Sequence, residues 1–423
     1  MTARRAAAEL LVAVLNDGRA LEDALDSTPS FAALTGRDRG FARAMAAAAL
    51  RRLGGIDAVL AQFLERPLHE SAAYARALLR VGAAQILVLG TPPHAAVGET
   101  VDAANATREG RPFARLINAV LRRISRDGPA MLAAQAPGTD LPAWLFTRWR
   151  AAYGAETADA IALALHAEPP LDLSVKADAQ DWAARLGGDV TPTGNVRLPL
   201  LARGGVDGLA GYGEGAWWVQ DAAAALPARL LGDVRARDVL DLCAAPGGKT
   251  LQLAAAGARV VAVDKSAERL ERLAENLQRT KLSARVVCAD VLDWRTDQRF
   301  DAILLDAPCT STGTLRRHPD VAWLRRPGDV RALSELQARM LSAAGGLLKP
   351  DGALVYAVCS LEPEEGPGVV AQALGEAWRR DPVRAGELPD EFITADGDMR
   401  TLPGRWPERG GLDGFFAARL RPA

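Results

Sequence analysis

The stretch from Asp241 to Thr250 constrains the fold of this chain more than any other, because it joins a strand to a helix through small residues. An apolar run, Val239–Leu242, precedes two adjacent glycines, and Leu251, Leu253 and several alanines follow them. A strand, a tight turn and a helix in this order are typical of a doubly wound α/β sheet, whose ligands bind outside the carboxyl ends of the strands. The free N–H groups of a helix N-terminus favour an anionic or zwitterionic ligand there.

The same stretch also resembles a phosphate-binding loop, since Gly248-Lys249-Thr250 is how a P-loop ends. The P-loop pattern requires a glycine five residues before Gly248, and this chain has Cys243 there. A second apolar strand, Val260–Val263, ends in Asp264, where a carboxylate can accept both hydroxyl groups of a ribose. The spacing of the two strands therefore favours a nucleoside ligand over a triphosphate.

Composition and charge exclude several classes of protein. The 423 residues are 49% hydrophobic with a mean hydropathy of −0.01, and no stretch approaches the roughly 18 apolar residues of a membrane span. The run Ala6–Leu15 imitates a signal peptide but continues into Asn16 and Asp17 without a cleavage site, so we expect a cytoplasmic protein. The net charge of −1 provides no overall attraction for nucleic acid, which would have to bind at local patches.

The four cysteines show neither a CxxC pattern nor the spacing of metal ligands, and the four histidines do not complete a ligand set. We therefore expect no disulfide framework and no bound metal. We also expect a monomer.

Three domains are predicted along the chain. Residues 1–130 show only helical patterns, and turn residues at 127–129 and 136–138 mark a linker. Residues 141–214 alternate helical and strand-like patterns, which predicts a small α+β module. Residues 215–423 alternate strands with helices and predict a Rossmann-like α/β sheet. Its predicted strands span residues 239–242, 260–264, 285–289, 302–305, 353–358 and 415–420.

The clearest amphipathic helix of the first domain follows Pro112. Apolar residues recur at steps of three and four from Phe113 to Ile124, while arginines occupy the other faces. These arginines are Arg115, Arg122, Arg123 and Arg126. The pattern fits an ordinary solvated face in an arginine-rich chain as well as it fits a nucleic-acid contact.

Acidic residues and cysteines gather at the predicted strand ends. Asp290, after the third strand of the large domain, is placed either to accept an adenine amino group or simply to face solvent. Asp306-Ala307-Pro308-Cys309 closes the fourth strand, and Cys359-Ser360 follows the fifth. Free cysteines are more often inert core residues than nucleophiles, but these two lie beyond strand ends and each precedes a polar residue.

These motifs together resemble the Sun family of RNA cytosine-carbon-5 methyltransferases. The resemblance rests on Asp241–Thr250, Leu304–Gly313, Arg316–Asp320 and Cys359-Ser360, with Val358 where the family usually has threonine. The helical region, through residues 92–97 and 116–122, resembles the NusB-like RNA-binding domain. This pairing is typical of bacterial enzymes that methylate the small-subunit (16S) ribosomal RNA.

The resemblance implies S-adenosylmethionine as the cofactor and assigns its parts to residues. The methionine part would lie on Cys243, Ala244, Ala245, Pro246, Gly247, Gly248 and Lys249, the ribose on Asp264 and the adenine on Asp290, with Asp306 beside the cofactor. It also implies that Cys359 attacks carbon 6 of the cytosine and that Cys309 assists product release. By its place in the sequence, Asp306 is the acidic candidate that assists at ring nitrogen 3.

The expected substrate is a cytosine that is unpaired or flipped out of its helix, since a stacked base cannot present carbon 6 to a thiol. The loop after the catalytic strand combines cations with Trp323, which is typical of RNA contact. The candidate RNA-binding residues are Arg316, Arg317, His318 and Arg325 in that loop and Arg122 and Arg123 in the helical domain.

Three alternatives remain from the sequence. A P-loop ATPase is disfavoured by Cys243 and Asp264. An amino-group methyltransferase has a motif similar to Asp306–Cys309, but an exocyclic amine needs no thiol nucleophile. An RNA-binding or antitermination protein with a decayed transferase is disfavoured by complete cofactor and cysteine motifs.

Overall fold

The computed structural model describes residues 2–199, 205–375 and 377–423. The chain forms two compact units. The first combines Met1–Ala167 with Leu315–Arg326, and the second combines Glu168–Thr314 with Pro327–Ala423. The chain therefore leaves the second unit just after the predicted catalytic strand and returns to it twelve residues later. No helix in the described ranges is both long and apolar enough to span a membrane.

The first unit is helical, as predicted for the N-terminal region. Its helices are α1 (Ala3–Leu15), α2 (Leu21–Ser27), α3 (Pro29–Ala32), α4 (Gly36–Arg51), α5 (Leu53–Ala61), α6 (Ala73–Leu87), α7 (Pro93–Asn105), α8 (Ala114–Ala133), α9 (Ala143–Tyr153), α10 (Ala155–Ala164) and α15 (Val321–Leu324). Alanine and leucine on the inner faces of α1, α4, α6 and α8 build one continuous core.

The amphipathic helix predicted after Pro112 is confirmed as α8. Its residues Ile117, Val120, Leu121 and Ile124 are buried, whereas its arginines are exposed. The prediction that turn residues 127–129 end this helix is wrong, because α8 continues to Ala133 with Pro129 inside it. Gly128 is buried there, and a side chain on it would meet Leu87 of α6 at 3.0 Å. Close helix packing therefore overrides the local turn signal.

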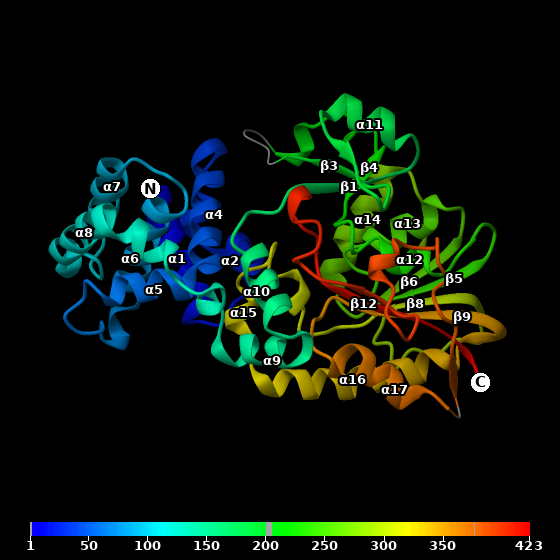
Figure 1. The fold of residues 1–423 in the computed structure, drawn as a ribbon. Helices are drawn as coiled ribbons and strands as arrows, with labels where there is room; N and C mark the ends of the chain where they lie inside the picture. Colours follow the sequence, from blue (N-terminus) through cyan, green and yellow to red (C-terminus); the bar gives the residue numbers. More distant parts are fainter. Residues whose placement is uncertain (1, 200–204, 376) are drawn as a thin grey trace. The chain divides into compact units, whose positions relative to one another are not determined.

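The segment Leu315–Arg326, here called the strap, belongs to the helical unit. The Asp320 carboxylate accepts the N–H of Leu21 at the start of α2, at 2.9 Å. The indole N–H of Trp323 donates to the Leu50 carbonyl at 3.0 Å, and Arg51 donates to the Arg316 carbonyl at 2.8 Å. Trp323 and Leu324 also pack against the helical core. Polar and apolar contacts together hold the strap on the helices; α15, its helical turn, is yellow in Figure 1.

We expect Trp323→Ala to loosen the strap, because it removes a hydrogen bond and a half-buried aromatic side chain. Truncating a fully buried Trp costs roughly 3 to 5 kcal/mol, so about half of that is expected here. Amide hydrogen exchange in residues 315–326 should become faster in this variant. Arg317→Ala, which changes an exposed side chain of the same segment, is the control. Unchanged protection in Trp323→Ala would show that the strap is held by other contacts.

The predicted middle module is divided between the two units. Its helical part, α9 and α10, lies in the helical unit, whereas its strands begin the second unit. There a sheet of order β2-β3-β1-β4 is covered by α11 (Ala179–Leu186). The strands are β1 (Leu171–Val175), β2 (Asp189–Val190), β3 (Val196–Leu198) and β4 (Trp217–Val219). The domain boundaries at residues 141 and 214 therefore stay a prediction.

The large sheet of the second unit has the order β10-β12-β9-β8-β5-β6-β7, with β11 paired to β12. Strands β5 to β9 run parallel, and β12 is antiparallel to β9. The strands are β5 (Asp238–Leu242), β6 (Arg259–Asp264), β7 (Arg285–Cys288), β8 (Phe300–Asp306), β9 (Leu348–Val358), β10 (Trp378–Arg380), β11 (Met399–Thr401) and β12 (Phe415–Pro422). The predicted Rossmann-like sheet is confirmed.

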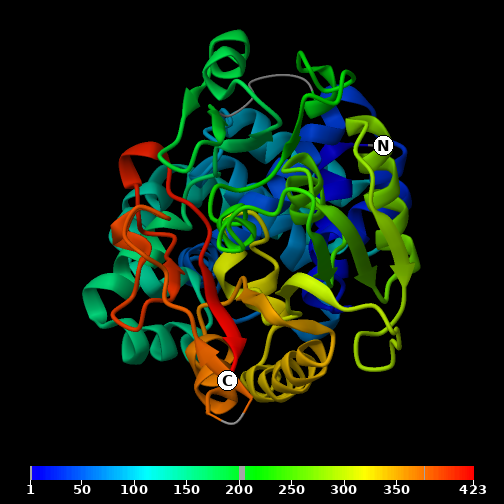
Figure 2. The ribbon, with the colours of Figure 1, turned by 90° about the vertical axis from the view of Figure 1, so that its right-hand side faces the viewer.

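Helices cover both faces of this sheet, as its apolar strands require. In Figures 1 and 2, α16 (Pro327–Gly345) and α17 (Val369–Ala373) lie together on one side. Met340 and Leu341 of α16 pack there against the buried residues of β8 and β9. On the other face lie α12 (Leu226–Arg229), α13 (Gly248–Ala255) and α14 (Ala267–Thr280). Because strands β5 to β9 are parallel, their carboxyl ends lie at one common edge of the sheet.

Candidate active site

The loop between β5 and α13 is shaped by residues with unusual backbone angles. Cys243 has φ of 61° and Gly247 has φ of 111°, so the chain turns sharply before Gly248 begins α13. Among the residues that the structure describes, no side chain caps the N-terminus of α13. The first N–H groups of this helix are thus available to an anionic ligand. Burial raises the pKa of the Cys243 thiol, so this cysteine stays protonated and is no nucleophile.

Asp241 joins strand β5 to helix α13 across the loop. Its side chain is fully buried, and its Oδ2 accepts the hydroxyl of Thr250 in α13 at 2.5 Å. Burial raises the pKa of this carboxyl to about 7. Its Oδ1 is buried without a hydrogen-bond partner in the described part of the chain. This acidic group fixes α13 on the sheet and is uncharged over part of the physiological pH range.

Asp264 lies at the end of β6 with 4% of its surface exposed. One carboxylate oxygen accepts the N–H of Ala245 at 3.1 Å, and the other accepts the N–H of Ser266 at 3.0 Å. A carboxylate oxygen has two lone pairs, so each still has one for a ligand hydroxyl. The arrangement therefore joins the loop after β5 to the start of α14 and fits the predicted ribose contact.

Asp290 follows β7, which pairs in parallel with β6. Its side chain is exposed, and one oxygen accepts the N–H of Leu292 at 2.9 Å. The register of β6 and β7 brings Asp264 and Asp290 to the same edge of the sheet. The loop position is compatible with the predicted adenine contact as well as with a solvated carboxylate that stabilises its own turn.

Lys249 and Asp306 form an ion pair at this edge. The Lys249 ammonium donates to Asp306 Oδ2 at 2.8 Å and lies 5.1 Å from the centre of the Phe415 ring. Burial lowers the pKa of Lys249, but the charge and hydrogen bond of Asp306 outweigh it and raise the pKa above its ordinary value. A stable positive charge therefore neighbours the carboxylate that ends β8.

The two predicted catalytic cysteines lie together although 50 residues separate them. The Sγ atoms of Cys309 and Cys359 are 3.4 Å apart. Backbone hydrogen bonds at Gly313 join three segments where they cross near the cysteines. Gly313 donates its N–H to the Cys359 carbonyl at 3.0 Å, and its own carbonyl accepts the N–H of Gly414 at 2.8 Å. A side chain on Gly313 would lie 1.9 Å from the Gly414 carbonyl oxygen. Only glycine fits this crossing.

The contact between the two thiols shifts their pKa values in opposite directions. The hydrogen bond with Cys309 lowers the pKa of Cys359, and Lys249 lowers it further, against the opposing effects of burial and Asp306. The same bond to Cys359 and burial raise the pKa of Cys309 well above its ordinary value. Cys359 is therefore the better thiolate of the two, and when it is ionised the Cys309 thiol can donate to it.

The structure places the predicted RNA-binding residues very differently. Arg316 is 1% exposed in the strap, so its guanidinium is no surface cation and does not fit direct contact with RNA. His318 is half-buried, and burial together with Arg317 lowers its pKa. Arg317 is exposed and Arg325 is half-buried. Residues of the motif from Arg316 to Asp320 therefore serve largely to attach the strap to the helices.

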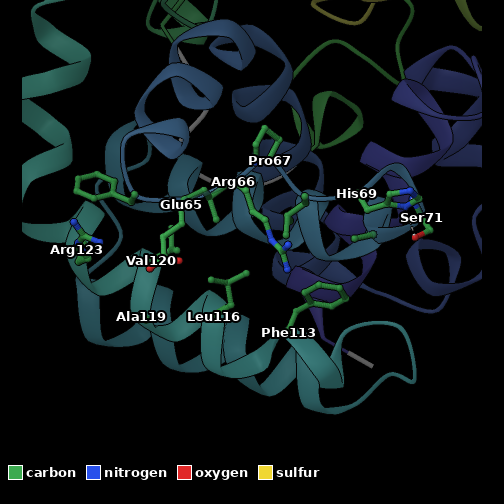
Figure 3. A pocket seen from close by; sticks show the side chains of 14 residues that line it. Glu65, Arg66, Pro67, His69, Ser71, Phe113, Leu116, Ala119, Val120 and Arg123 are labelled. Atoms are coloured by element: carbon green, nitrogen blue, oxygen red, sulfur yellow. Dashed lines mark hydrogen bonds between the residues drawn. The ribbon is translucent and has the colours of Figure 1, made fainter.

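Arg122 and Arg123 are exposed on α8, as the helical pattern predicted. Arg123 stacks over the Phe63 ring at 4.9 Å and lines an open cavity of about 850 Å³ between α8 and the segment 63–72. Figure 3 shows Arg66 and Phe113 on the walls of this cavity. The helical unit therefore has a groove that combines guanidinium groups with aromatic rings.

Sequence reasoning missed several residues that build the site. Glu365 contacts the residue after each cysteine, and Gln337 of α16 supports it. Asp241 opened the recognised motif, but its buried carboxyl had no assigned role. A polar residue within the apolar stripe of α16 was the available signal for Gln337, whereas nothing distinguished Glu365 from Glu364.

Comparison with known proteins finds matches to both parts of the chain. Residues 228–421 match the family model described as 16S rRNA methyltransferase RsmB/F, and residues 1–126 match the NusB family. The chain is 38% identical to ribosomal RNA small subunit methyltransferase B of Sodalis glossinidius over 436 residues, which cover 98% of this chain and 96% of that protein. The protein of the same name from Xanthomonas campestris is 39% identical over 445 residues, covering 100% and 98%.

Solved structures share the fold. PH0851 superposes with a TM-score of 0.77 at 22% identity and covers 100% of this chain and 99% of its own. A methyltransferase homologue from Pyrococcus horikoshii has a TM-score of 0.56 at 28% identity, covering 67% of this chain and 96% of its own. Because the sequence similarity runs through both the helical unit and the sheet, the chain belongs to the family of ribosomal RNA small subunit methyltransferase B, the 16S ribosomal RNA methyltransferases with a NusB-family domain.

Proposed function

We propose that this 16S ribosomal RNA methyltransferase modifies carbon 5 of a cytosine through a covalent bond between Cys359 and carbon 6. The observation that carries the proposal is the 3.4 Å separation of two thiols beside an ion pair at the ligand-binding edge of the sheet. An enzyme that methylates an amino group has no use for this arrangement, since an exocyclic amine attacks the methyl group directly.

The thiolate of Cys359 adds to carbon 6, and the ring becomes an enamine whose carbon 5 is nucleophilic. S-Adenosylmethionine, the methyl donor of this family, supplies an electrophilic methyl group to that carbon. Carbon 5 then loses its proton, the bond between sulfur and carbon 6 breaks, and the electron pair restores the aromatic ring. The products are 5-methylcytosine, S-adenosylhomocysteine, the proton lost from carbon 5 and a free thiolate on Cys359.

The changing state of Cys359 explains how Cys309 assists the last step. While Cys359 is a thiolate, its charge and its hydrogen bond with Cys309 raise the pKa of Cys309. In the adduct Cys359 is an uncharged thioether, so both effects disappear and the pKa of Cys309 falls. The Cys309 thiol can then give up its proton to solvent, and the resulting thiolate is the base that removes the proton from carbon 5.

Asp306 and Lys249 are the groups that assist at ring nitrogen 3. Addition at carbon 6 places negative charge on the ring, and a proton or hydrogen bond at nitrogen 3 stabilises it. Asp306 ends its strand beside the cysteine loop, and the Lys249 ammonium lies within hydrogen-bond distance of its Oδ2. The pair can hold a proton close to that nitrogen. The carboxylate can also accept a hydrogen bond from the neighbouring amino group of the cytosine.

The residues at the strand ends fit S-adenosylmethionine. The open N-terminus of α13 at Gly247 and Gly248 suits the carboxylate of the methionine part. Asp264 keeps one lone pair on each oxygen for the ribose hydroxyls. Asp290 follows the adjacent strand and remains the candidate for the adenine. Cys243 stands where the phosphate-binding loop of an ATPase has a glycine, which speaks against a triphosphate ligand.

We expect Asp264→Ala to weaken S-adenosylhomocysteine binding by roughly 1 to 3 kcal/mol, the cost of leaving ligand hydroxyls unpaired. Titration calorimetry of the full-length protein measures the loss. Asp293→Ala removes an exposed carboxylate near Asp290 and should bind like the wild type. Equal affinities of Asp264→Ala and wild type would remove Asp264 from the cofactor site.

Ribosomal RNA is the substrate of the family, and we propose that its target cytosine reaches the thiols unpaired or flipped out. The exposed arginines of α8 provide a surface for the surrounding RNA backbone. Arg317 and Arg325 of the strap complete the proposed contacts, whereas Arg316 takes part only by holding the strap. A single polypeptide suffices for this chemistry, and a monomeric state stays a prediction.

We expect Arg122→Ala combined with Arg123→Ala to raise KM for RNA several-fold and leave kcat and cofactor affinity unchanged. The slope of log KM against log salt concentration should fall by about 1 to 2. Each phosphate contact releases about one counterion on binding, and the variant makes fewer such contacts. Arg331→Ala, an exposed arginine of α16, is the control. A double variant with the wild-type salt dependence would assign α8 to another partner.

The function is tested by nucleoside analysis. The purified enzyme, 16S ribosomal RNA and S-adenosylmethionine should give 5-methylcytosine, and digestion with mass spectrometry identifies the product. N4-methylcytosine or a methylated adenine in its place would overturn the assignment to carbon 5.

A further inference from the structure

Glu365 lies where the two cysteine loops meet. It belongs to a short π-helical turn, Glu364–Gly368, and its side chain is fully buried. Its Oε1 accepts the backbone N–H of Thr310 at 2.8 Å. Its Oε2 accepts the hydroxyl of Thr310 and, at 2.5 Å, the hydroxyl of Ser360. Thr310 directly follows Cys309, and Ser360 directly follows Cys359, so one carboxylate holds the neighbour of each thiol.

Gln337 of α16 supports this carboxylate. Its Nε2 lies 3.0 Å from Glu365 Oε1 and 2.9 Å from the carbonyl of Pro308, the residue before Cys309. The Tyr356 hydroxyl lies 3.1 Å from Gln337 Oε1 and 2.5 Å from the Glu365 carbonyl oxygen. Thr310 is thereby tied directly to Glu365, in the turn that follows Cys359, and Pro308 is tied to it through Gln337.

The carboxylate uses its full acceptor capacity in these contacts. Four donors are directed at two oxygens, and an ionised carboxylate offers about four lone-pair sites. Hydrogen bonds to a charged acceptor are shorter and stronger than neutral ones. Because the group is buried, moving either loop leaves an unpaired acceptor without water to replace the lost donor. The network therefore resists separation of the loops.

We propose that Glu365 is a positioning residue that sets the distance between the Cys309 and Cys359 thiols. The inference rests on the proposed function in one respect, that both thiols take part in the reaction. Its contacts reach the backbone or side chains of residues adjacent to the two cysteines and leave the predicted cofactor residues untouched. Misplacement of reacting groups by about 1 Å can cost roughly 10²-fold in rate, so this spacing matters for turnover.

Thr310 offers the sharpest test, because two variants separate hydrogen bonding from packing. Thr310→Val keeps the shape and loses the hydroxyl that donates to Glu365, whereas Thr310→Ser keeps the hydroxyl and loses a methyl group. Positioning by the carboxylate predicts that kcat falls by about 10-fold or more in Thr310→Val and stays near wild type in Thr310→Ser. A role in packing alone predicts the opposite order, which would overturn the proposal.

Glu365→Gln is the direct variant, and Glu364→Gln, an exposed neighbour in the same turn, is its matched control. An amide turns two acceptor sites into donors that face other donors, so kcat should fall by about 10²-fold. KM for RNA and affinity for S-adenosylhomocysteine should change less than 2-fold. If Glu365→Gln does not fold, the Thr310 pair decides the question. Wild-type kcat in a folded Glu365→Gln would overturn the proposal.

The thiol spacing itself can be measured without methyl transfer. Diamide oxidises two nearby thiols to a disulfide, and mass spectrometry of proteolytic fragments follows formation of the Cys309–Cys359 bond. We expect this oxidation to be several-fold slower in Glu365→Gln and Thr310→Val than in wild type, Glu364→Gln and Thr310→Ser. An unchanged rate alongside reduced kcat would overturn the proposed role in spacing. Because this readout needs no adduct with RNA, it stays informative even if the proposed carbon-5 chemistry fails.

Discussion

Cys359→Ala is expected to reduce methyl transfer by at least about 10⁴-fold, because no other group is placed to add to carbon 6. Cys309 lies 3.4 Å away but has its pKa raised, and the Cys243 thiol is held protonated by burial. Methylation of 16S ribosomal RNA with labelled S-adenosylmethionine measures the loss. Cofactor affinity should stay at the wild-type value, since the proposed cofactor residues lie on other strand ends.

Cys288→Ala is the matched control for that experiment. Cys288 is an exposed cysteine of β7 and takes no part in the proposed reaction. Its variant should methylate RNA like the wild type. Appreciable turnover in Cys359→Ala would mean that the reaction needs no thiol at this position.

Asp241→Asn is expected to become more stable relative to the wild type as pH rises. The folded state raises the pKa of Asp241 from 3.8 to about 7, so its contribution to stability is complete below pH 4 and is lost as pH rises through 7. At about 1.4 kcal/mol per unit, the difference between the two proteins should change by up to about 4 kcal/mol between pH 4 and 8. Asparagine keeps an acceptor for Thr250 without a charge to bury.

Urea titrations at several pH values give the free energy of unfolding for this comparison. Asp293→Asn alters an exposed carboxyl and should follow the wild-type pH dependence. Parallel curves for Asp241→Asn and the wild type would show that Asp241 titrates at its ordinary pKa.

Local sequence patterns were sufficient for the sheet and for the strand-turn-helix at Asp241–Thr250. Strands β5, β6 and β8 are apolar runs bounded by turns, and the parallel pairing of β6 with β7 brings Asp264 and Asp290 to one edge. The closeness of Cys309 and Cys359 also follows, because each comes directly after one of two adjacent strands, β8 and β9. A single rule, that parallel strands end together, explains these successes.

The remaining features depend on contacts between segments that are distant in sequence. The strap was predicted only as an RNA-binding loop, because arginines stand beside a tryptophan. Its attachment to the helices was not predicted, since Asp320 and Trp323 bind partners 299 and 273 residues earlier in the chain. The continuation of α8 through Pro129 depends on the packing of Gly128 against α6. No local pattern contains these partners, so single-sequence reasoning could not find them.

Trapping of the covalent complex tests the central proposal most directly. Cys309→Ala should still attack and transfer the methyl group but release the product slowly, so an adduct of protein and RNA should accumulate on a denaturing gel. The double variant with Cys359→Ala should give no adduct, since release cannot be blocked where attack never happened. An adduct in Cys359→Ala but not in Cys309→Ala would show exchanged roles, and the absence of an adduct from both single variants would contradict covalent catalysis.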